Sequence, residues 1–329
     1  MIGKTASLVT GRHVPDRSVG FARQYRQEGY VRKIGIIGVP SSAGARHTGQ
    51  ERAPRLFRQA GLIGHLQSAG SEVVDYGDLS EVHFQPDQKN PKAQNLQLVA
   101  DVVARVAEKV QGAILDNALP IVLGGDCTIT LGVVAGLAGQ TPNLGLMYFD
   151  GDVDLNTPDT TPSGIFDGMV MAHMIGKGHE TLARSGPRYP LMAEEDIVLF
   201  GYNADAGAID PPEIEELQQC HMMKYPVSRI QGKAGEVARE ALSHLEKRTE
   251  SILVHFDVDV IDYSDFPVGD VAHHGGLSFD DAMSVLGMFA ASPKFGALVI
   301  TEFNADRDPD GTHALRFVDA VAKTLEEKA

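Results

Sequence analysis

Residues 144–154, LGLMYFDGDVD, pass directly from a run of apolar and small residues into three carboxylates. Uninterrupted apolar runs are typical of strands that are buried on both faces of a parallel sheet. Ligands of open α/β sheets bind outside the carboxyl ends of the strands, which is where Asp150, Asp152 and Asp154 would lie. Three carboxylates this close repel one another unless they bind a polyvalent cation or take up protons. We therefore expect a cation among them.

The same arrangement occurs twice more. Residues 251–259, SILVHFDVD, end in Asp257 and Asp259, and residues 119–127, LPIVLGGDC, lead through two glycines to an acid and the thiol of Cys127. A single D-x-D after a strand is as often a helix cap or a turn. Three strands that each deliver an acid to one sheet edge are hard to explain by turns alone, so we favour metal binding.

Composition narrows the class of protein. A chain of 329 residues that is 43% hydrophobic can form one large α/β domain or two small ones. The 44 acids against 29 bases give a net charge of -15, which argues against nucleic-acid binding. Most of this excess charge is expected to form a soluble acidic surface, and the alternative is an acidic cleft that attracts a cationic substrate. Two cysteines provide no disulfide framework, which points to the cytoplasm. No apolar run approaches membrane-spanning length and the N-terminus lacks a signal-peptide core, so no membrane association is expected.

Strand-like and helix-like patterns alternate along the chain, and this alternation predicts a three-layer α/β/α domain with a mostly parallel central sheet over residues 33–329. Expected strands cover residues 33–40, 72–76, 121–123, 145–149, 197–201, 222–225, 252–256 and 296–303. Expected helices cover residues 51–60, 93–117, 128–137, 169–176, 212–218, 235–247, 278–288 and 312–327. Residues 1–32, rich in arginine, are expected to form an arm that contacts a neighbouring subunit or stays a solvated tail.

Four motifs, taken in this order, resemble those of the ureohydrolase superfamily, which includes arginases, agmatinases and formimidoylglutamases. They are GGDC at 124–127, FDGDVD at 149–154, HFDVDVID at 255–262 and TEFN at 301–304. The resemblance runs from Lys33 to the C-terminus. It implies an arginase-like fold, a binuclear manganese centre, hydrolysis of a guanidino or amidino C–N bond, and a homo-oligomer, commonly a trimer or hexamer.

Three family histidines are replaced in this sequence. Cys127 stands in place of the histidine of GGDH, Asp152 in place of that of D-A-H-x-D, and Asp167 in place of a proton-shuttle histidine. The retained family acids are Asp150, Asp154, Asp257 and Asp259. Cys127 could equally be a small buried thiol with no ligand role, and Asp152 a non-ligand.

The resemblance implies two metal sites that share ligands. Ligands of the first ion would be Cys127, Asp150, Asp154 and Asp257. Ligands of the second ion would be Asp150, Asp152, Asp257 and Asp259. The carboxylates favour Mn²⁺, whereas the thiolate favours Zn²⁺ or Fe²⁺. Ni²⁺ and partial or absent occupancy remain open.

Catalytic roles are also carried over from the family. A hydroxide bridging the two ions would attack the amidino carbon, and Asp154 would orient it and take its proton. Glu302 would pair with the substrate guanidinium. Asp167 would protonate the leaving amine only if burial raises its pKa; the alternative is a loop or helix-cap aspartate.

Residues for substrate recognition are less clearly marked. Asn156 and Ser163 match positions that hold the amino-acid end of the substrate in arginases. His273 and His274 fall near the expected pocket mouth, where they would contact substrate or replace a lost histidine as ligand or acid/base; the alternative is two partly exposed loop histidines. His255, on a strand, and His173, on an otherwise apolar helix, are both expected to be packed, hydrogen-bonded residues.

The preferred function is a metal-dependent hydrolase of a small cationic guanidino or amidino compound other than L-arginine, since Ile165 and residues 202–207 match arginases poorly. The alternative is a catalytically impaired family member that acts as a binding or regulatory subunit, in a hetero-oligomer with an active paralogue. The three lost histidines motivate that alternative. A third hypothesis uses the same site on an amide or formimino C–N bond.

Overall fold

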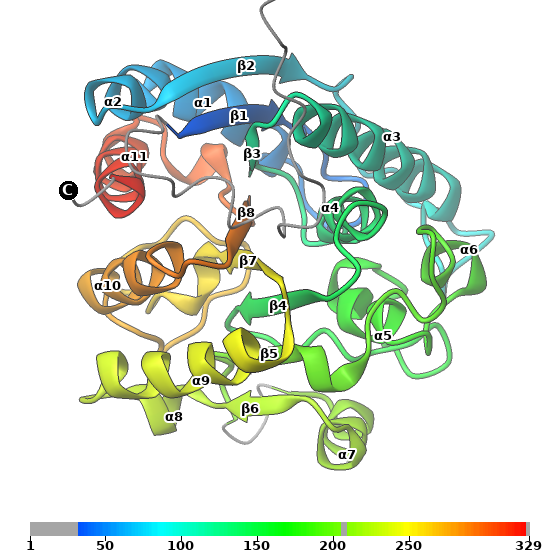
Figure 1. Ribbon diagram of the computed structural model, residues 1–329. Coiled ribbons are helices and arrows are strands. Elements are labelled where there is room, and N and C mark those ends of the chain that lie inside the picture. The colour runs from blue at the N-terminus through cyan, green and yellow to red at the C-terminus, as the bar shows by residue number, and fades with distance from the viewer. Residues whose placement is uncertain (1–31, 205–208, 327–329) are drawn as a thin grey trace, which may run out of the picture.

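The computed structural model describes residues 32–204 and 209–326, so the predicted arm lies, apart from Arg32, outside the described residues. Its centre is an eight-stranded sheet in the order β2-β1-β3-β8-β7-β4-β5-β6 (Figure 1). Every strand pair is parallel. The predicted α/β class and the predicted parallel sheet are therefore confirmed.

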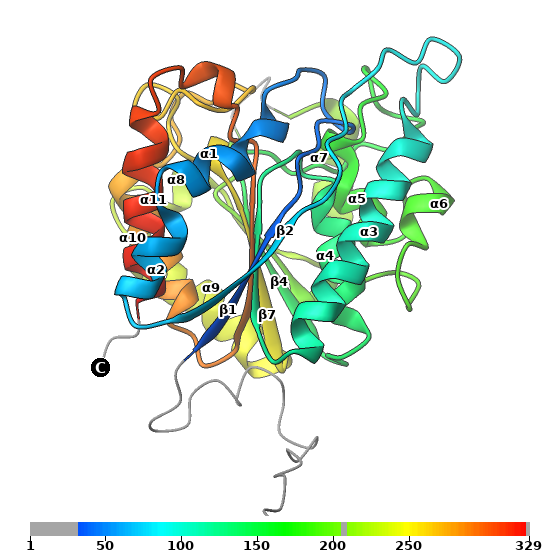
Figure 2. The same ribbon diagram turned by 90° about the horizontal axis from the view of Figure 1, so that it is seen from above.

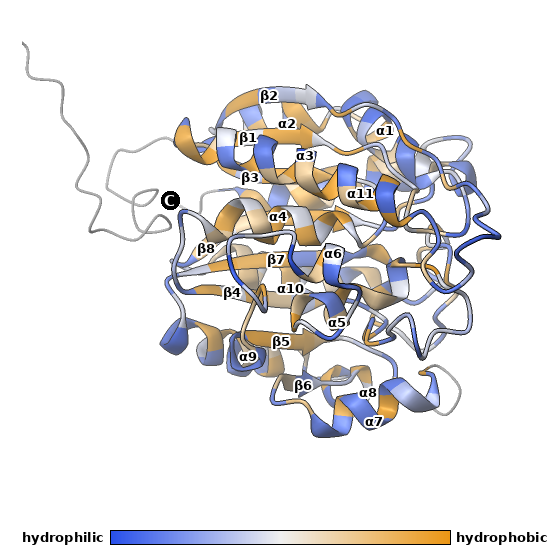
Figure 3. Cartoon of the chain, turned by 90° about the vertical axis from the view of Figure 1, so that its right-hand side faces the viewer, coloured by the Kyte–Doolittle hydropathy of each residue, from blue (hydrophilic) through white to orange (hydrophobic). Residues whose placement is uncertain are grey.

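All eight expected strands are present, with ends that differ by a few residues from the prediction. They are β1 Lys33–Gly38, β2 Glu72–Asp78, β3 Leu119–Leu123, β4 Leu144–Phe149, β5 Ile197–Phe200, β6 Met223–Tyr225, β7 Ser251–Asp257 and β8 Phe295–Thr301. Most of the strands are coloured as hydrophobic along their length (Figure 3). Every residue of β3, β4, β7 and β8 is buried, as expected for strands covered on both faces.

Helices cover both faces of the sheet (Figure 2). One layer contains α1 Ala53–Gln59, α2 Leu62–Ser68, α8 Val227–Ile230, α9 Ala234–Arg248, α10 Phe279–Ala290 and α11 Thr312–Leu325. The other layer contains α3 Leu96–Leu115, α4 Ile129–Ala138, α5 Val170–Met174, α6 Glu180–Ala183 and α7 Pro211–Gln219. No helix in the described ranges is long and apolar enough to cross a membrane.

The helix expected over residues 51–60 is divided in the structure. A 3₁₀ turn, η2 Gln50–Arg52, precedes α1, and Gly61 with φ 90° ends that helix before α2, which the sequence analysis missed. The long helix α3 starts at Leu96 because Asn95 is left-handed, with φ 60°. The four-residue helices α6 and α8 were also missed, since they are too short to show a period.

The topology places the ends of four strands side by side. Strands β3, β8, β7 and β4 are consecutive neighbours in the sheet. Because all of them are parallel, the residues that follow them meet at one edge. These are the segments that carry the acids singled out in the sequence, together with Cys127 and Glu302.

Helix α4 packs unusually closely on α3. All ten residues of α4 are buried. A Cβ atom built on Gly132 would lie 2.6 Å from the Val103 carbonyl oxygen, and one on Gly136 would lie 2.7 Å from that of Ala107. The absence of a side chain at these two positions therefore lets the helix backbones approach each other.

We expect Gly132→Ala to lower the free energy of unfolding by about 1–3 kcal/mol, because the added methyl group meets a backbone atom that cannot move away. Urea denaturation measures this change. Gly139→Ala is the matched control, since a Cβ there has no neighbour within 4 Å and its φ is -72°. Equal stability of Gly132→Ala and the wild type would contradict the close helix approach.

His173, on α5, is fully buried and hydrogen-bonded at both ring nitrogens. Its Nδ1 lies 2.6 Å from the Met169 carbonyl oxygen, and its Nε2 accepts the His179 N–H at 2.9 Å. This partner pair requires the neutral ring with its proton on Nδ1. Burial lowers the pKa of His173 from 6.5 to about 4. The expectation of a packed, hydrogen-bonded His173 is confirmed.

The pKa of His173 is lower in the folded than in the unfolded protein. The neutral ring therefore contributes fully to the free energy of unfolding above pH 6.5, and this contribution is lost as the pH falls towards 4. The full contribution amounts to about 3 kcal/mol. We expect His173→Asn to lose less stability than the wild type between pH 6.5 and 4, measured by urea denaturation at each pH. Parallel pH profiles for the two proteins would contradict this assignment.

Candidate metal centre

A cavity of about 270 Å³ lies at the carboxyl ends of β3, β4, β7 and β8. Its lining contains the thiol of Cys127 and eight acids. The acids are Asp150, Asp152, Asp154, Asp167, Asp257, Asp259, Asp270 and Glu302. Of the residues predicted for metal binding and catalysis, every one lines this cavity.

Left-handed backbone conformations direct several of these groups into the cavity. Gly124 and Gly125 turn the chain sharply after β3 with φ values of 75° and 93°, and a Cβ on Gly125 would lie 2.8 Å from the Val39 carbonyl oxygen. Asp154 and Glu302 are also left-handed, with φ values of 49° and 64°. This conformation is uncommon for residues with side chains, and such strain is concentrated at functional sites.

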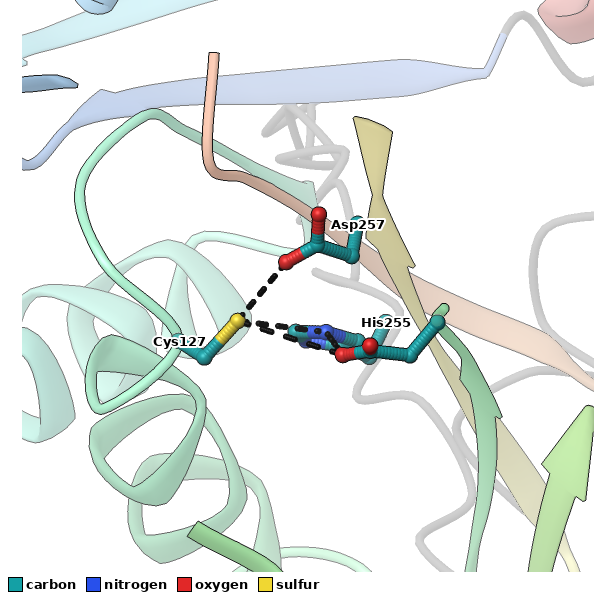
Figure 4. A group of neighbouring side chains, drawn as sticks. Cys127, His255 and Asp257 are labelled. Carbon is teal, nitrogen blue, oxygen red and sulfur yellow. Dashed lines mark hydrogen bonds and ion pairs between the residues drawn. The ribbon is translucent and has the colours of Figure 1, made fainter. Parts of the chain in front are cut away.

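The inner group consists of Cys127, Asp150, His255 and Asp257, whose ligand atoms all lie within 4.8 Å of one another. Cys127 Sγ is 2.8 Å from Asp257 Oδ2 and 3.8 Å from His255 Nε2. Asp150 Oδ2 is 3.1 Å from the same imidazole nitrogen. Figure 4 shows the sulfur close to both the Asp257 carboxylate and the His255 ring. The group thus combines sulfur, nitrogen and oxygen donors.

His255 is held rigidly below the cavity. Its ring stacks on Tyr148, with 4.1 Å between centroids and 9° between planes, and its Nδ1 lies 2.8 Å from Thr130 Oγ1. Burial lowers the pKa of His255 to about 3, so the ring is neutral. The expectation of a packed, hydrogen-bonded residue is confirmed, but its neighbours in the acid group were missed. The available signal was that His255 and Asp257 are two residues apart on one strand and therefore share a face.

The outer group consists of Asp152, Asp259 and His273. His273 Nε2 lies 3.1 Å from Asp152 Oδ2 and 3.5 Å from Asp259 Oδ2. Burial opposes the charged imidazole, but the two carboxylates outweigh it and raise the pKa of His273 to about 12. Despite its burial, the pKa of Asp259 is lowered by His273.

The two neighbouring loop histidines separate in the structure. His273 is only 7% exposed and turns towards the acids, whereas His274 is exposed. The alternative of two partly exposed loop histidines is therefore wrong for His273. Both residues line a second cavity, of about 510 Å³, next to the first.

A third group contains Cys127, Asp167 and Glu302. Glu302 Oε2 accepts a hydrogen bond from Gln50 Nε2, while Glu302 Oε1 and Gln50 Oε1 are buried without a partner among the described residues. Asp167 Oδ1 accepts the Cys127 N–H at 2.7 Å; this N–H precedes the N-cap residue of α4, so the contact is not a helix cap. Gln50, which the sequence analysis missed, comes from the turn η2 on the far side of the cavity.

The acids are poorly neutralised. Burial first, and neighbouring carboxylates second, raise the pKa values of Asp150, Asp154 and Asp257 well above their usual range. Within the described ranges, the only basic side chains at ion-pair distance from the two metal-ligand groups are His255 and His273. Closely spaced oxygen, nitrogen and sulfur donors with excess negative charge fit divalent cations.

The observed groups differ from the predicted ligand sets: His255 and His273 join them, and Asp150 and Asp257 belong to the inner group and not to both. Asp154 belongs to none of the three groups; its carboxylate accepts a hydrogen bond from the Tyr148 hydroxyl. The predicted bridging acids Asp150 and Asp257 each turn Oδ2 towards the inner group. Their Oδ1 atoms accept the backbone N–H of the residue two positions on, at 2.7 and 2.8 Å.

The two residues predicted to hold the amino-acid end of a substrate are not in one cavity. Ser163 lines the acid cavity, and its Oγ accepts the Ile165 N–H at 3.2 Å. Asn156 lines the neighbouring cavity, where its amide donates to Asp210 at 3.2 Å and its oxygen accepts from Thr160 at 3.1 Å. The Asn156 side chain is thus occupied by Thr160 of its own loop and by Asp210 at the start of α7.

Comparison with known proteins gives a consistent assignment. The Arginase family profile matches residues 32–325. An arginase of Brevibacillus brevis is 31% identical over 287 residues, which cover 86% of this chain and 94% of the relative. Solved arginases from Bacillus caldovelox and Bacillus cereus superpose with TM-scores of 0.84 and 0.82, at 28% and 30% identity, over 91% of this chain and 99% of theirs. The chain belongs to the arginase family.

Proposed function

We propose that this protein is a divalent-metal-dependent hydrolase that cleaves a C–N bond in a guanidino or amidino compound. Membership of the arginase family supports a hydrolase of this class. The observation that carries the proposal is the pair of unpaired, buried acceptors, Glu302 Oε1 and Gln50 Oε1, beside the acid groups. Such acceptors suit a cationic ligand with several N–H donors.

Two ions would be held at the inner and outer groups, with Cys127, Asp150 and Asp257 around one and Asp152, Asp259 and His273 around the other. When bound, divalent ions of this kind supply a nucleophilic water at neutral pH and polarise the carbon under attack. Mn²⁺ remains the first expectation for the outer group, whose donors are mainly carboxylate oxygens.

Glu302 would orient the substrate. A planar guanidinium or amidinium presents parallel N–H groups, which match a carboxylate in a charge-assisted pair. Glu302 Oε2 is already bonded to Gln50, so Oε1 is the oxygen that remains for the substrate. The burial of this carboxylate excludes water, which strengthens the pairing.

Asp154 and Asp167 would move protons. Asp154, fixed by the Tyr148 hydroxyl, would accept the proton of the attacking water. Burial, together with Asp126, raises the pKa of Asp167 well above its usual range, so it can carry the proton that the leaving amine requires. Its Oδ1 is bonded to the Cys127 N–H, which leaves Oδ2 as the proton-carrying atom.

The substrate is proposed to differ from L-arginine. Asn156 is hydrogen-bonded to Thr160 and Asp210 and lines the neighbouring cavity, so it is not placed to hold an amino-acid end together with Ser163. A homo-oligomer and a cytoplasmic location are proposed on the family resemblance and on the free thiols of Cys127 and Cys220. Light scattering of the purified protein measures the oligomer.

We expect Glu302→Gln to lower kcat/KM for a guanidino substrate by about 10–100-fold, since charge-assisted hydrogen bonds contribute about 1.5–3 kcal/mol. Metal content, measured by mass spectrometry of the elements, should stay unchanged. Glu246→Gln is the control, because Glu246 bonds Ser292 and does not line the cavity. A Glu302→Gln variant with wild-type kcat/KM would rule out this role.

Chelator treatment should abolish release of urea or ammonia from a panel of guanidino and amidino compounds, and Mn²⁺, Ni²⁺ or Zn²⁺ should restore it. The purified protein is expected to bind two ions per chain. A metal-free chain that stays inert with all three ions would refute the proposed hydrolase. A metal-loaded but inert chain would favour the regulatory-subunit alternative, which mixing with a paralogue of the same family tests.

A further inference from the structure

We propose that His255 is a direct ligand of the inner metal ion, which makes this ion's site a thiolate–imidazole–carboxylate site. The proposal rests on the proposed function, because it assigns a ligand within the metal centre invoked there. The motif HFDVDVID begins with His255, but the family resemblance gives this residue no ligand role; it lies within strand β7, two residues before Asp257.

The separations of the donor atoms agree with one shared ion. Around a tetrahedral Zn²⁺, oxygen and nitrogen ligands lie about 3.4 Å apart, and sulfur lies about 3.6 Å from either. His255 Nε2 is 3.1 Å from Asp150 Oδ2 and 3.8 Å from Cys127 Sγ. Cys127 Sγ is 2.8 Å from Asp257 Oδ2 and 4.0 Å from Asp150 Oδ2. Shifts of less than about 1 Å would place all four atoms on one ion.

The orientation of the ring also fits a ligand. Metal-binding histidines usually donate their second ring N–H to a fixed acceptor, which sets the tautomer and aims the other nitrogen at the metal. Here Nδ1 faces Thr130 Oγ1 at 2.8 Å, and Tyr148 fixes the ring plane by stacking. In the tautomer that donates from Nδ1 to Thr130 Oγ1, the lone pair on Nε2 points into the inner group.

His255 lies on the side of the inner group that does not face the cavity. Cys127, Asp150 and Asp257 line the cavity, whereas His255 is fully buried and does not. An imidazole bound from below occupies no space on the side from which a substrate enters. The mixture of sulfur, nitrogen and oxygen donors favours Zn²⁺, Co²⁺ or Fe²⁺ over Mn²⁺ at this inner position.

X-ray absorption of the full-length protein loaded with one equivalent of Zn²⁺ tests the assignment without any activity measurement. We expect one sulfur at about 2.3 Å, nitrogen and oxygen at about 2.0 Å, and the outer-shell scattering of an imidazole. The imidazole scattering should persist in His273→Asn and disappear in His255→Asn, while the sulfur remains in both. With Co²⁺, the thiolate charge-transfer band should be lost in Cys127→Ser.

Thr130→Val keeps the ring and tests its orientation if His255→Asn fails to fold. Zn²⁺ affinity, measured by chelator competition, should fall by about 10–100-fold in Thr130→Val. His173→Asn is the matched control, since His173 is equally buried but lies outside the acid groups, and its Zn²⁺ affinity should equal that of the wild type.

The outcomes separate the two proposals. A wild-type protein that binds none of Mn²⁺, Ni²⁺, Zn²⁺ and Co²⁺ overturns both the metal-dependent function and the role of His255. A protein that binds Mn²⁺ but neither Zn²⁺ nor Co²⁺ overturns only the role of His255. A protein that binds Zn²⁺ through sulfur, with imidazole scattering that survives in His255→Asn or with full affinity in Thr130→Val, overturns only the role of His255. Loss of the imidazole signal in His255→Asn, with sulfur retained, supports it.

Discussion

Mutual repulsion among buried carboxylates is the constraint on which the site depends. A parallel sheet sends the ends of β3, β8, β7 and β4 to the same edge, and each of these strands is followed by an acid. Burial and neighbouring negative charge both raise the pKa values of these acids, so the folded chain must bind protons or cations there. The parallel sheet that forms the core therefore also gathers buried acids that require protons or cations to neutralise them.

The sheet and the acid groups could be predicted because their signals are local. Long apolar runs mark the buried strands, and the acids stand immediately after them. The proximity of His255 to Cys127 could not be predicted, because it depends on how β3, β8 and β7 are aligned. Gln50 was missed for the same reason: it reaches Glu302 across 252 positions of sequence. Short helices such as α6 and α8 offered too few residues for a period.

The structure places other histidines beside two of the positions where family histidines are replaced. Cys127 and Asp152 remove two imidazoles from the motifs, yet His255 and His273 lie beside these two residues. These two imidazole rings add nitrogen donors, one from a strand and one from a loop, to the four acids retained from the family. The motifs therefore lack two imidazoles, but the folded site contains two others. This weakens the case for a catalytically impaired enzyme.

Cys127 and Thr130 lie three residues apart at the start of α4, and the Thr130 N–H donates to the Cys127 carbonyl oxygen at 3.1 Å. One rigid turn thereby carries both the sulfur and the hydroxyl that faces the His255 ring. Displacement of α4 along its axis would move both groups together relative to β7. Since α4 is wedged against α3, an ion held between helix and strand would join the two layers of the fold and slow the opening of α4 to hydrogen exchange.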